Sequence, residues 1–393
     1  MRHARLSLTL IVTAVLATAC TDSAPESKPT TTPSASSTKS APANTPKLDV
    51  STIADGLEHP WDIAVLPSGE LLFTERDRAR VSILTADGKR RTVLESPTGM
   101  WHGGETGLMG IELAPDFEST REFITCHGFQ AGGTQDVRVV RWRLDGAMEK
   151  ASKVRDLVTG LPSSSGRHGG CSLATDPDGA LFVGTGDAAI GTNAQNLDSG
   201  GGKVLRVDAT TGDGLPGNPY ADDDNAMKRR VWTYGHRNVQ GLAFDADDNL
   251  YGAEHGPDVD DEVNRIQKGG NYGWNPVPGF NESVPMTDND LPGEQIAAAW
   301  SSGRPTLAVS GAAFLIGDDW GSLEGVLAVT ALKDESLRFM RFNNAGKFVD
   351  ESSVKEFDST YGRLRGAIVG PDGTLYITSS NGSDDVIVKV LPR

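Results

Sequence analysis

Positive charge is scarce in this sequence of 393 residues. Its 37 Lys and Arg face 53 Asp and Glu, which gives a formal net charge of −16 and a pI near 4.9. Because the phosphates of nucleic acid would repel such a surface, nucleic-acid binding is not expected. Long helical periodicity is also lacking, and after the first twenty residues no segment is apolar enough to span a membrane.

The single long apolar run lies at the N-terminus. Arg2 and Arg5 precede an apolar stretch over residues 6–19, which is shorter than the roughly 20 residues that span a bilayer. A basic start followed by a short apolar run predicts a signal peptide over residues 1–19, and therefore an exported protein.

Cysteine is rare, with three in the chain. Cys20 follows Leu-Ala-Thr-Ala, which resembles a bacterial lipobox, although Ala17 stands where leucine is usual. We therefore expect a lipid on Cys20 and a protein that faces outward from the cell membrane; the alternative is cleavage near Ala19, which gives a secreted or periplasmic soluble protein. Outside the cytoplasm, the pair Cys126 and Cys171 suggests a disulfide, with two buried thiols as the alternative.

Large apolar residues are almost absent from residues 21–46, which consist mainly of Ser, Thr, Pro, Ala and Lys. Such a segment cannot bury a core and is expected to be a flexible tether. The lipid on Cys20 is thus predicted to anchor residues 20–46 at the membrane. This tether would hold the folded domain, residues 47–393, away from the membrane surface.

A strand–turn–strand pattern recurs about six times in the predicted domain. In each copy an apolar strand enters a Pro/Asp/Gly turn and a second strand follows, as in residues 62–74 and 172–184. The copies start near residues 62, 110, 172, 241, 311 and 367. Repeated hairpins at such long intervals are typical of propellers. We predict an all-β fold, a six-bladed β-propeller, with a β-sandwich or a parallel β-helix as the alternative.

Glycine-rich loops between these strands carry several basic side chains. They are His168, Arg237, Lys333, Arg363 and Arg365. A single Arg or Lys is usually a solvated surface group, but equivalent strand ends of a propeller converge on one face and could bring these residues together. Because clustered cations repel one another, a small ligand with several carboxylates is expected to bind them.

An acidic, glycine-containing loop is the second candidate site. Asp258, Asp260, Asp261 and Glu262 follow Gly256-Pro257. Carboxylates and main-chain carbonyls suit a hard cation such as Ca²⁺. A solvated acidic turn is the alternative.

Six segments, taken in order, resemble the soluble quinoprotein glucose/sorbosone dehydrogenases, a family also called aldose sugar dehydrogenases. The segments are GETGLMGIELAPDF (104–117), HGG (168–170), YGHRNVQGL (234–242), EHGPDVDDEVN (254–264), KGGNYGW (268–274) and RLRG (363–366). The resemblance covers roughly residues 50–391 and is most specific over residues 234–274.

The resemblance implies a six-bladed propeller that holds pyrroloquinoline quinone (PQQ) and Ca²⁺ on one face. His168 looks like the general base, and Arg237 looks suited to stabilise negative charge on the reduced quinone. The implied cofactor contacts are Glu105, Arg237, Asn238, Lys333, Arg363 and Arg365. The three carboxylates of PQQ would provide the negative charge that the clustered basic side chains are expected to bind.

The resemblance also implies two calcium ions. Gly256 and Pro257 look like main-chain donors to the ion that touches the quinone and makes it a better hydride acceptor. Glu262 and Tyr272 look like ligands of a structural ion, Tyr272 through its main chain.

Three positions depart from the family pattern. Glu105 stands where the best-known glucose oxidiser has an amide, Arg167 where it has an acidic residue, and Cys171 where arginine is common. A carboxylate next to a tricarboxylate ligand should weaken binding unless it is protonated or bonded to a cation.

The expected activity is transfer of a hydride from C1 of an aldose-type sugar to PQQ, with Ca²⁺ assistance, which gives the lactone. The electrons would pass to an external acceptor. Two other readings remain: a Ca²⁺-dependent lactonase on the same fold, and a non-catalytic propeller that binds a glycan or a protein.

Overall fold

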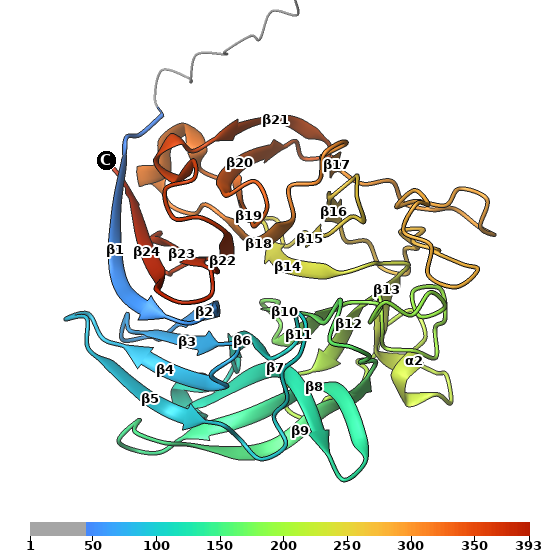
Figure 1. Ribbon diagram of the computed structural model, residues 1–393, viewed down its shortest axis with the longest axis horizontal. Helices are drawn as coiled ribbons and strands as arrows, with labels where there is room; N and C mark the ends of the chain where they lie inside the picture. The colour runs from blue at the N-terminus through green and yellow to red at the C-terminus, as the bar shows by residue number, and fades with distance from the viewer. Residues whose placement is uncertain (1–44) are drawn as a thin grey trace, which may run out of the picture. The chain divides into compact units, whose positions relative to one another are not determined.

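The computed structural model describes residues 45–393 and arranges them as a wheel of six four-stranded antiparallel sheets (Figure 1). This is the predicted six-bladed β-propeller. The signal peptide, Cys20 and nearly all of the predicted tether lie outside the described residues. Within residues 45–393, no helix is long and apolar enough to cross a membrane.

The blades follow one another along the chain; each of the first five is a meander of four consecutive strands, and the sixth is completed by the N-terminal strand. Blade one contains β2 (Pro60–Val65), β3 (Leu71–Glu75), β4 (Arg80–Leu84) and β5 (Arg90–Glu95). Blade two contains β6 (Leu108–Leu113), β7 (Glu122–Ala131), β8 (Thr134–Leu144) and β9 (Ala151–Leu161). Blade three contains β10 (Gly170–Thr175), β11 (Ala180–Thr185), β12 (Lys203–Asp208) and β13 (Val231–Tyr234).

The second half of the wheel repeats this order. Blade four contains β14 (Val239–Phe244), β15 (Leu250–Glu254), β16 (Glu262–Arg265) and β17 (Trp300–Ser301). Blade five contains β18 (Val309–Phe314), β19 (Leu327–Ala331), β20 (Ser336–Phe342) and β21 (Phe348–Ser353). Blade six contains β22 (Leu364–Val369), β23 (Leu375–Ser379), β24 (Asp385–Pro392) and β1 (Leu48–Leu57). The short helical turns are α1 (Phe117–Thr120), α2 (Ala226–Arg230), η1 (Asp318–Leu323) and η2 (Lys355–Phe357).

The two ends of the domain close the wheel together. Strand β1 pairs with β24, so that Leu48 lies opposite Pro392 and Val50 opposite Val390. The N-terminal strand thus becomes the outer strand of the last blade, and unfolding that blade requires separating both ends of the domain.

Each repeat seen in the sequence supplies the two inner strands of one blade. The first strands of neighbouring blades contact one another around the axis. Gly110 on β6 lies against the carbonyl of Cys171 on β10, where an added Cβ would come within 2.1 Å of that oxygen. The absence of a side chain lets the inner strands approach backbone to backbone.

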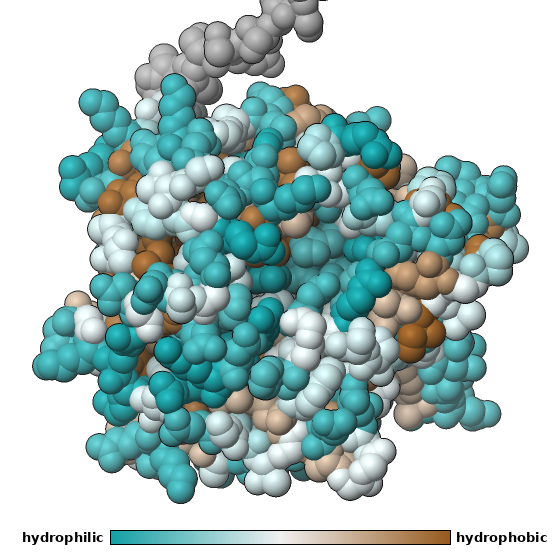
Figure 2. Space-filling view, viewed as in Figure 1, coloured by the Kyte–Doolittle hydropathy of each residue, from teal (hydrophilic) through white to brown (hydrophobic). Residues whose placement is uncertain are grey.

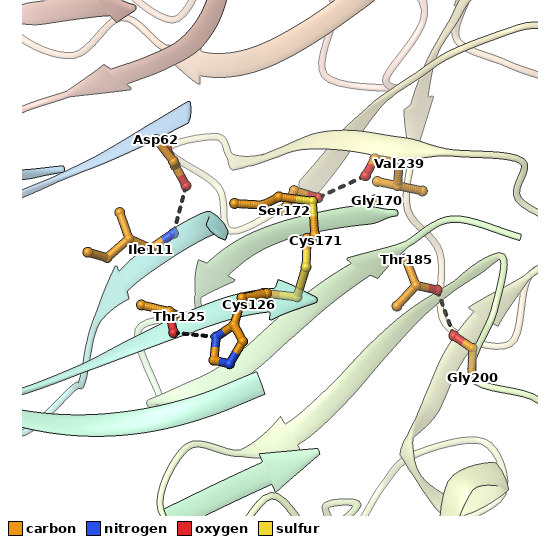
Figure 3. The surroundings of a disulfide bond; sticks show 12 residues. Asp62, Ile111, Thr125, Cys126, Gly170, Cys171, Ser172, Thr185, Gly200 and Val239 are labelled. Carbon is orange, nitrogen blue, oxygen red and sulfur yellow. Dashed lines mark hydrogen bonds between the residues drawn. A yellow bond between two sulfur atoms is a disulfide. The ribbon is translucent and has the colours of Figure 1, made fainter. Parts of the chain in front are cut away.

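A disulfide joins blades two and three. Cys126 on β7 and Cys171 on β10 are bonded, with their Cα atoms 5.4 Å apart (Figure 3). Both cysteines are buried and pack with Ile124, Leu173 and Val183 between the two sheets. Because Cys171 lies three residues after His168, this bond fixes the strand that follows the candidate base.

A cavity of about 40 Å³ lies where the six inner strands meet, and its walls include Asp62, Glu112, Gln240 and Arg365. A polar cavity needs about 10–15 Å³ of space open to a water-sized sphere to hold one water molecule, so this cavity has room for water. Burial raises the pKa of Asp62 to about 6. Burial, together with the nearby charge of Asp62, raises the pKa of the half-buried Glu112 to about 8.

The raised pKa of Glu112 predicts a pH-dependent stability. As pH rises from 4.5, the ordinary pKa of a glutamate, toward about 8, the unfolded chain releases a proton that folded Glu112 retains. The free energy of unfolding then falls by up to about 1.4 kcal/mol per pH unit. We expect Glu112→Gln to stabilise the protein more at pH 8 than at pH 5, measured by denaturant unfolding. The exposed Glu118 provides the control Glu118→Gln, and an equal effect of E112Q at both pH values would contradict the assignment.

Candidate active site

His168 lies in the loop between β9 and β10 and is buried. Its Nδ1 is 2.7 Å from Oδ1 of Asp187, which follows β11. Asp187 can approach His168 this closely because the preceding residue, Gly186, lies against the His168 carbonyl. A Cβ at position 186 would clash with that oxygen at 1.9 Å. The carboxylate partner places the ring proton on Nδ1, and among residues 45–393 nothing bonds to Nε2. His168 is therefore oriented to accept a proton at Nε2.

Asp187 is itself held by two further donors. Its Oδ1 accepts a hydrogen bond from the Ala189 amide at 2.7 Å, and its Oδ2 accepts one from Nε1 of Trp274 at 2.7 Å. Its own amide donates to the carbonyl of Arg237 at 2.8 Å. Asp187 thus ties the His168 loop to the loop that carries Arg237.

Arg237 lies between β13 and β14, and its side chain is buried. Its guanidinium donates to the His255 carbonyl at 3.1 Å and to Oε1 of Glu282 at 2.6 Å. Its Nε is buried without a partner among residues 45–393. A buried guanidinium N–H without an acceptor is costly and marks a place for an anionic or carbonyl oxygen.

Glu105 and Arg365 are linked through the amide of Gln240. Asn238 donates to Oε2 of Glu105 at 3.0 Å, and Gln240 donates to the same oxygen at 3.4 Å. Oε1 of Gln240 accepts from Arg365 at 2.6 Å, and the Arg365 guanidinium lies 3.7 Å from the centre of the Trp61 ring. The structure therefore brings Glu105, Asn238 and Arg365 together, as expected for one site.

Electrostatics in this cluster favour an anion. Burial lowers the pKa of Arg365 to about 9, and its Nε has no partner in the described part of the chain. Burial raises the pKa of Glu105, but His255, His168, Asn238 and Arg365 lower it further, so the net pKa is below its ordinary value. Burial lowers the pKa of His255 to about 3, so that ring is neutral at pH 7. The charge of Glu105 is then stabilised by hydrogen bonds from Asn238 and Gln240 and by the positive charge of Arg365. Glu105 is therefore ionised, and its charge is partly balanced.

The other two predicted cations lie at the exposed rim. Lys333 follows β19 and donates to Oγ1 of Thr306 at 3.2 Å. Arg363 precedes β22 and is close enough to Arg365 to contribute to its lowered pKa. Figure 2 shows that the face seen in Figure 1 is hollowed at its centre and that hydrophilic residues surround the hollow. The five basic side chains thus divide into a buried pair of arginines, a buried histidine and two solvent-exposed side chains.

Gly256 and Pro257 directly follow His255, whose carbonyl contacts Arg237. Asp261 fixes this loop, because its carboxylate accepts hydrogen bonds from the amides of Gly256 at 2.8 Å, Leu307 at 2.5 Å and Ala308 at 2.6 Å. Within residues 45–393 no donor bonds to the carbonyl oxygens of Gly256 or Pro257. These two oxygens are therefore free to bind a cation next to Arg237.

Glu262 belongs to a separate buried cluster of oxygen atoms. It accepts a hydrogen bond from Nδ2 of Asn264 at 3.0 Å, and Oδ1 of Asn264 has no partner among the described residues. Burial and the neighbouring charge of Glu254 raise the pKa of Glu262 well above its ordinary value. Burial and the charges of Glu254 and Glu262 raise the pKa of the Tyr272 phenol, and the Tyr272 carbonyl accepts a bond from Oγ1 of Thr287 at 3.2 Å. Two carboxyl groups and an unpartnered amide oxygen suit a hard cation, although within residues 45–393 no group of three His, Cys, Asp or Glu could hold a metal ion.

Sequence reasoning missed Asp187 and Glu282, and it gave Trp274 only as the last residue of the segment KGGNYGW. Asp187 offered a weak signal, because it follows a predicted strand that ends in Gly-Thr-Gly. Glu282 offered none, since it lies in a long loop without a recognisable pattern. Both became visible only through the partners that the fold brings to them.

Comparison with known proteins identifies the same family that the six sequence segments resemble. The family model of glucose/sorbosone dehydrogenase matches residues 57–388. The chain is 32% identical to the aldose sugar dehydrogenase YliI of Escherichia coli, over 88% of this chain and 93% of that protein. The PQQ-bound aldose sugar dehydrogenase of Streptomyces coelicolor superposes with a TM-score of 0.73 at 30% identity, covering 88% and 99% of the two chains. The apo-form of the E. coli aldose sugar dehydrogenase gives 0.78 at 30% identity, covering 88% and 100%.

Proposed function

We propose that this chain, which belongs to the glucose/sorbosone dehydrogenase family, oxidises an aldose-type sugar at C1 to its lactone and passes the electrons to an external acceptor. Membership of the family makes it a PQQ-dependent sugar dehydrogenase, an oxidoreductase. The specific sugar position, the use of Ca²⁺ and the electron acceptor are our proposals.

The arrangement of His168 and Asp187 carries this proposal. Asp187 holds the Nδ1 proton, so Nε2 is the atom that takes the proton from the C1 hydroxyl as the hydride leaves. Arg237, whose Nε lacks a partner, lies on the adjacent loop and stabilises negative charge that develops in the site. Because both groups are already buried and oriented, little reorganisation is required for the reaction.

The residues present fit the cofactor and the cation that the family uses. The buried N–H groups of Arg237 and Arg365, which lack acceptors, would bind carboxylate or quinone oxygens, with Asn238, Lys333 and Arg363 around them. Glu105 is compatible with a bound anion because Asn238, Gln240 and Arg365 offset its charge. The carbonyls of Gly256 and Pro257 would hold one Ca²⁺, and Glu262 with the Tyr272 carbonyl a second. When bound, the quinone would supply the hydride acceptor, and the first Ca²⁺ would supply a Lewis acid that makes it a better acceptor.

We further propose that the protein is exported and anchored outward at the cell membrane by a lipid on Cys20. The predicted signal peptide and the Ser/Thr/Pro-rich tether support this location. The disulfide between Cys126 and Cys171 agrees with an oxidising compartment. The electrons would then pass to an acceptor at the outer surface of the cell membrane.

The test is reconstitution of the apo-protein with PQQ and Ca²⁺. We expect reduction of an artificial dye by aldoses, a change in the quinone absorption spectrum when sugar is added, and loss of both signals when either PQQ or Ca²⁺ is left out. No dye reduction across a panel of aldoses, combined with no PQQ binding, would contradict the proposal. Lactone hydrolysis without PQQ would instead support a lactonase.

A further inference from the structure

Residues 275–299 are the later part of the long connection, residues 266–299, between β16 and β17 of blade four, which projects at the right of the wheel in Figure 1. The Phe280 ring lies 5.7 Å from the ring of His168 and 6.3 Å from the ring of Trp274. This segment therefore forms part of the wall of the candidate site beside the imidazole of His168, which we assign as the base. A sugar whose C1 hydroxyl reaches His168 must pass close to this segment.

Glu282 in this segment binds two arginines from two different loops, Arg167 between β9 and β10 and Arg237 between β13 and β14. Its Oε1 accepts a hydrogen bond from Arg237 at 2.6 Å, and both of its oxygens lie 3.0 Å from a guanidinium nitrogen of Arg167. Burial raises the pKa of Glu282, but the hydrogen bonds from Arg237 and Arg167 lower it further, so this carboxylate is ionised at neutral pH. One negative charge is thus shared between two positive charges.

This ion-pair cluster is open to entering molecules. The side chains of Arg167 and Glu282 are 46% and 34% exposed, whereas that of Arg237 is 6% exposed. A charged group on a sugar that binds here would meet Arg167 and Glu282 before it reached the buried Arg237. Such partly exposed charges affect selectivity between ligands more than they affect overall stability.

We propose that Glu282 is a specificity-determining residue that selects uncharged aldoses and disfavours aldoses that carry a carboxylate. This inference rests on the proposed sugar oxidation. An acidic sugar has to compete with Glu282 for Arg167 and Arg237, and it is also repelled by the Glu282 carboxylate. Without that charge, two guanidinium groups at the same wall attract an acidic sugar.

The experiment compares three sugars of similar size and different charge: glucose, glucuronate and glucosamine. In Glu282→Gln, we expect kcat/KM for glucuronate to rise about fivefold relative to glucose, which is the upper end of the range for one partly exposed charge pair. For glucosamine we expect a fall relative to glucose. Glu294→Gln is the matched control, because Glu294 lies in the same segment, is exposed and makes no ion pair among the described residues. That control should leave all three ratios as in the wild type.

A second variant separates charge from local structure. Adding Arg167→Gln to Glu282→Gln removes one of the two uncompensated cations, so the glucuronate-to-glucose ratio should return toward the wild-type value. Equal changes for all three sugars in Glu282→Gln would overturn the inference, because they would mean that Glu282 only fastens the segment.

Binding to the apo-protein provides a readout that does not depend on turnover. Isothermal titration with glucuronate should give tighter binding to E282Q than to the wild type or to E294Q, and unchanged binding would overturn the inference. Failure of the wild type to oxidise glucose would count against the proposed function. Normal glucose oxidation without the charge-dependent shift would count against the role of Glu282 alone.

Discussion

Replacing His168 with asparagine is expected to lower kcat about a thousandfold, the middle of the range for loss of a general base. The amide cannot accept the proton from the sugar hydroxyl, because it lacks a basic nitrogen. Cofactor binding should persist, since the side chains with unpartnered N–H groups, Arg237 and Arg365, are unchanged. The measurements are dye reduction at saturating sugar and a PQQ titration of the same preparation.

The control for this variant is His102→Asn. His102 is exposed and makes no hydrogen bond with another described residue, so its loss should change kcat less than twofold. An unchanged kcat in His168→Asn would show that another group takes the proton. A parallel loss of PQQ binding would mean that His168 holds the cofactor rather than acting as the base.

The blade architecture could be predicted because its signal is local. An alternating strand, a Gly- or Asp-containing turn and a second strand are encoded within about thirteen residues, as over 62–74, and each such copy forms the inner half of a blade. The closure of the wheel could not be predicted in the same way. The pairing of Leu48 with Pro392 joins residues from opposite ends of the domain. Nothing in the sequence of either strand indicates which strand it pairs with.

The outer strands show the same limit. Strand β17 contains only Trp300 and Ser301, and it pairs with β16 across the long connection of residues 266–299. Two residues are too few to give a periodic pattern, so the sequence indicated a long loop and nothing more. The number of blades was therefore predictable from the inner strands, whereas the fourth strand of each blade had to come from the structure.

Residues of the candidate site could be recognised in the sequence where a residue type was unusual in its surroundings. His168 among glycines and the Arg-Asn pair at 237–238 stand out in a chain with few basic residues. Asp187 and Glu282 are two of 53 acidic residues, and nothing in their neighbours along the chain distinguishes them. Their importance arises from partners that are distant in sequence, Trp274 for Asp187 and Arg167 for Glu282.

Asp187→Asn provides the second large expected effect, a fall in kcat of about 10²- to 10³-fold, because the variant disturbs the proton on His168. Wild-type Asp187 accepts a bond from the histidine at one oxygen and from the Trp274 indole at the other. Asparagine has only one oxygen. If that oxygen stays with Trp274, the NH₂ group faces Nδ1 of His168, and the ring proton moves to Nε2, where the sugar proton must be accepted.

A double variant tests this explanation, because Trp274→Phe removes the competing indole N–H. In Asp187→Asn/Trp274→Phe the amide oxygen can turn to His168 and restore the proton to Nδ1, so we expect kcat to recover about tenfold over Asp187→Asn alone. Trp274→Phe by itself controls for the loss of packing, and ¹⁵N NMR of the histidine ring reports which nitrogen carries the proton. If the double variant is no faster than Asp187→Asn and the ring proton stays on Nδ1 throughout, then Asp187 acts through its charge and not through the orientation of His168.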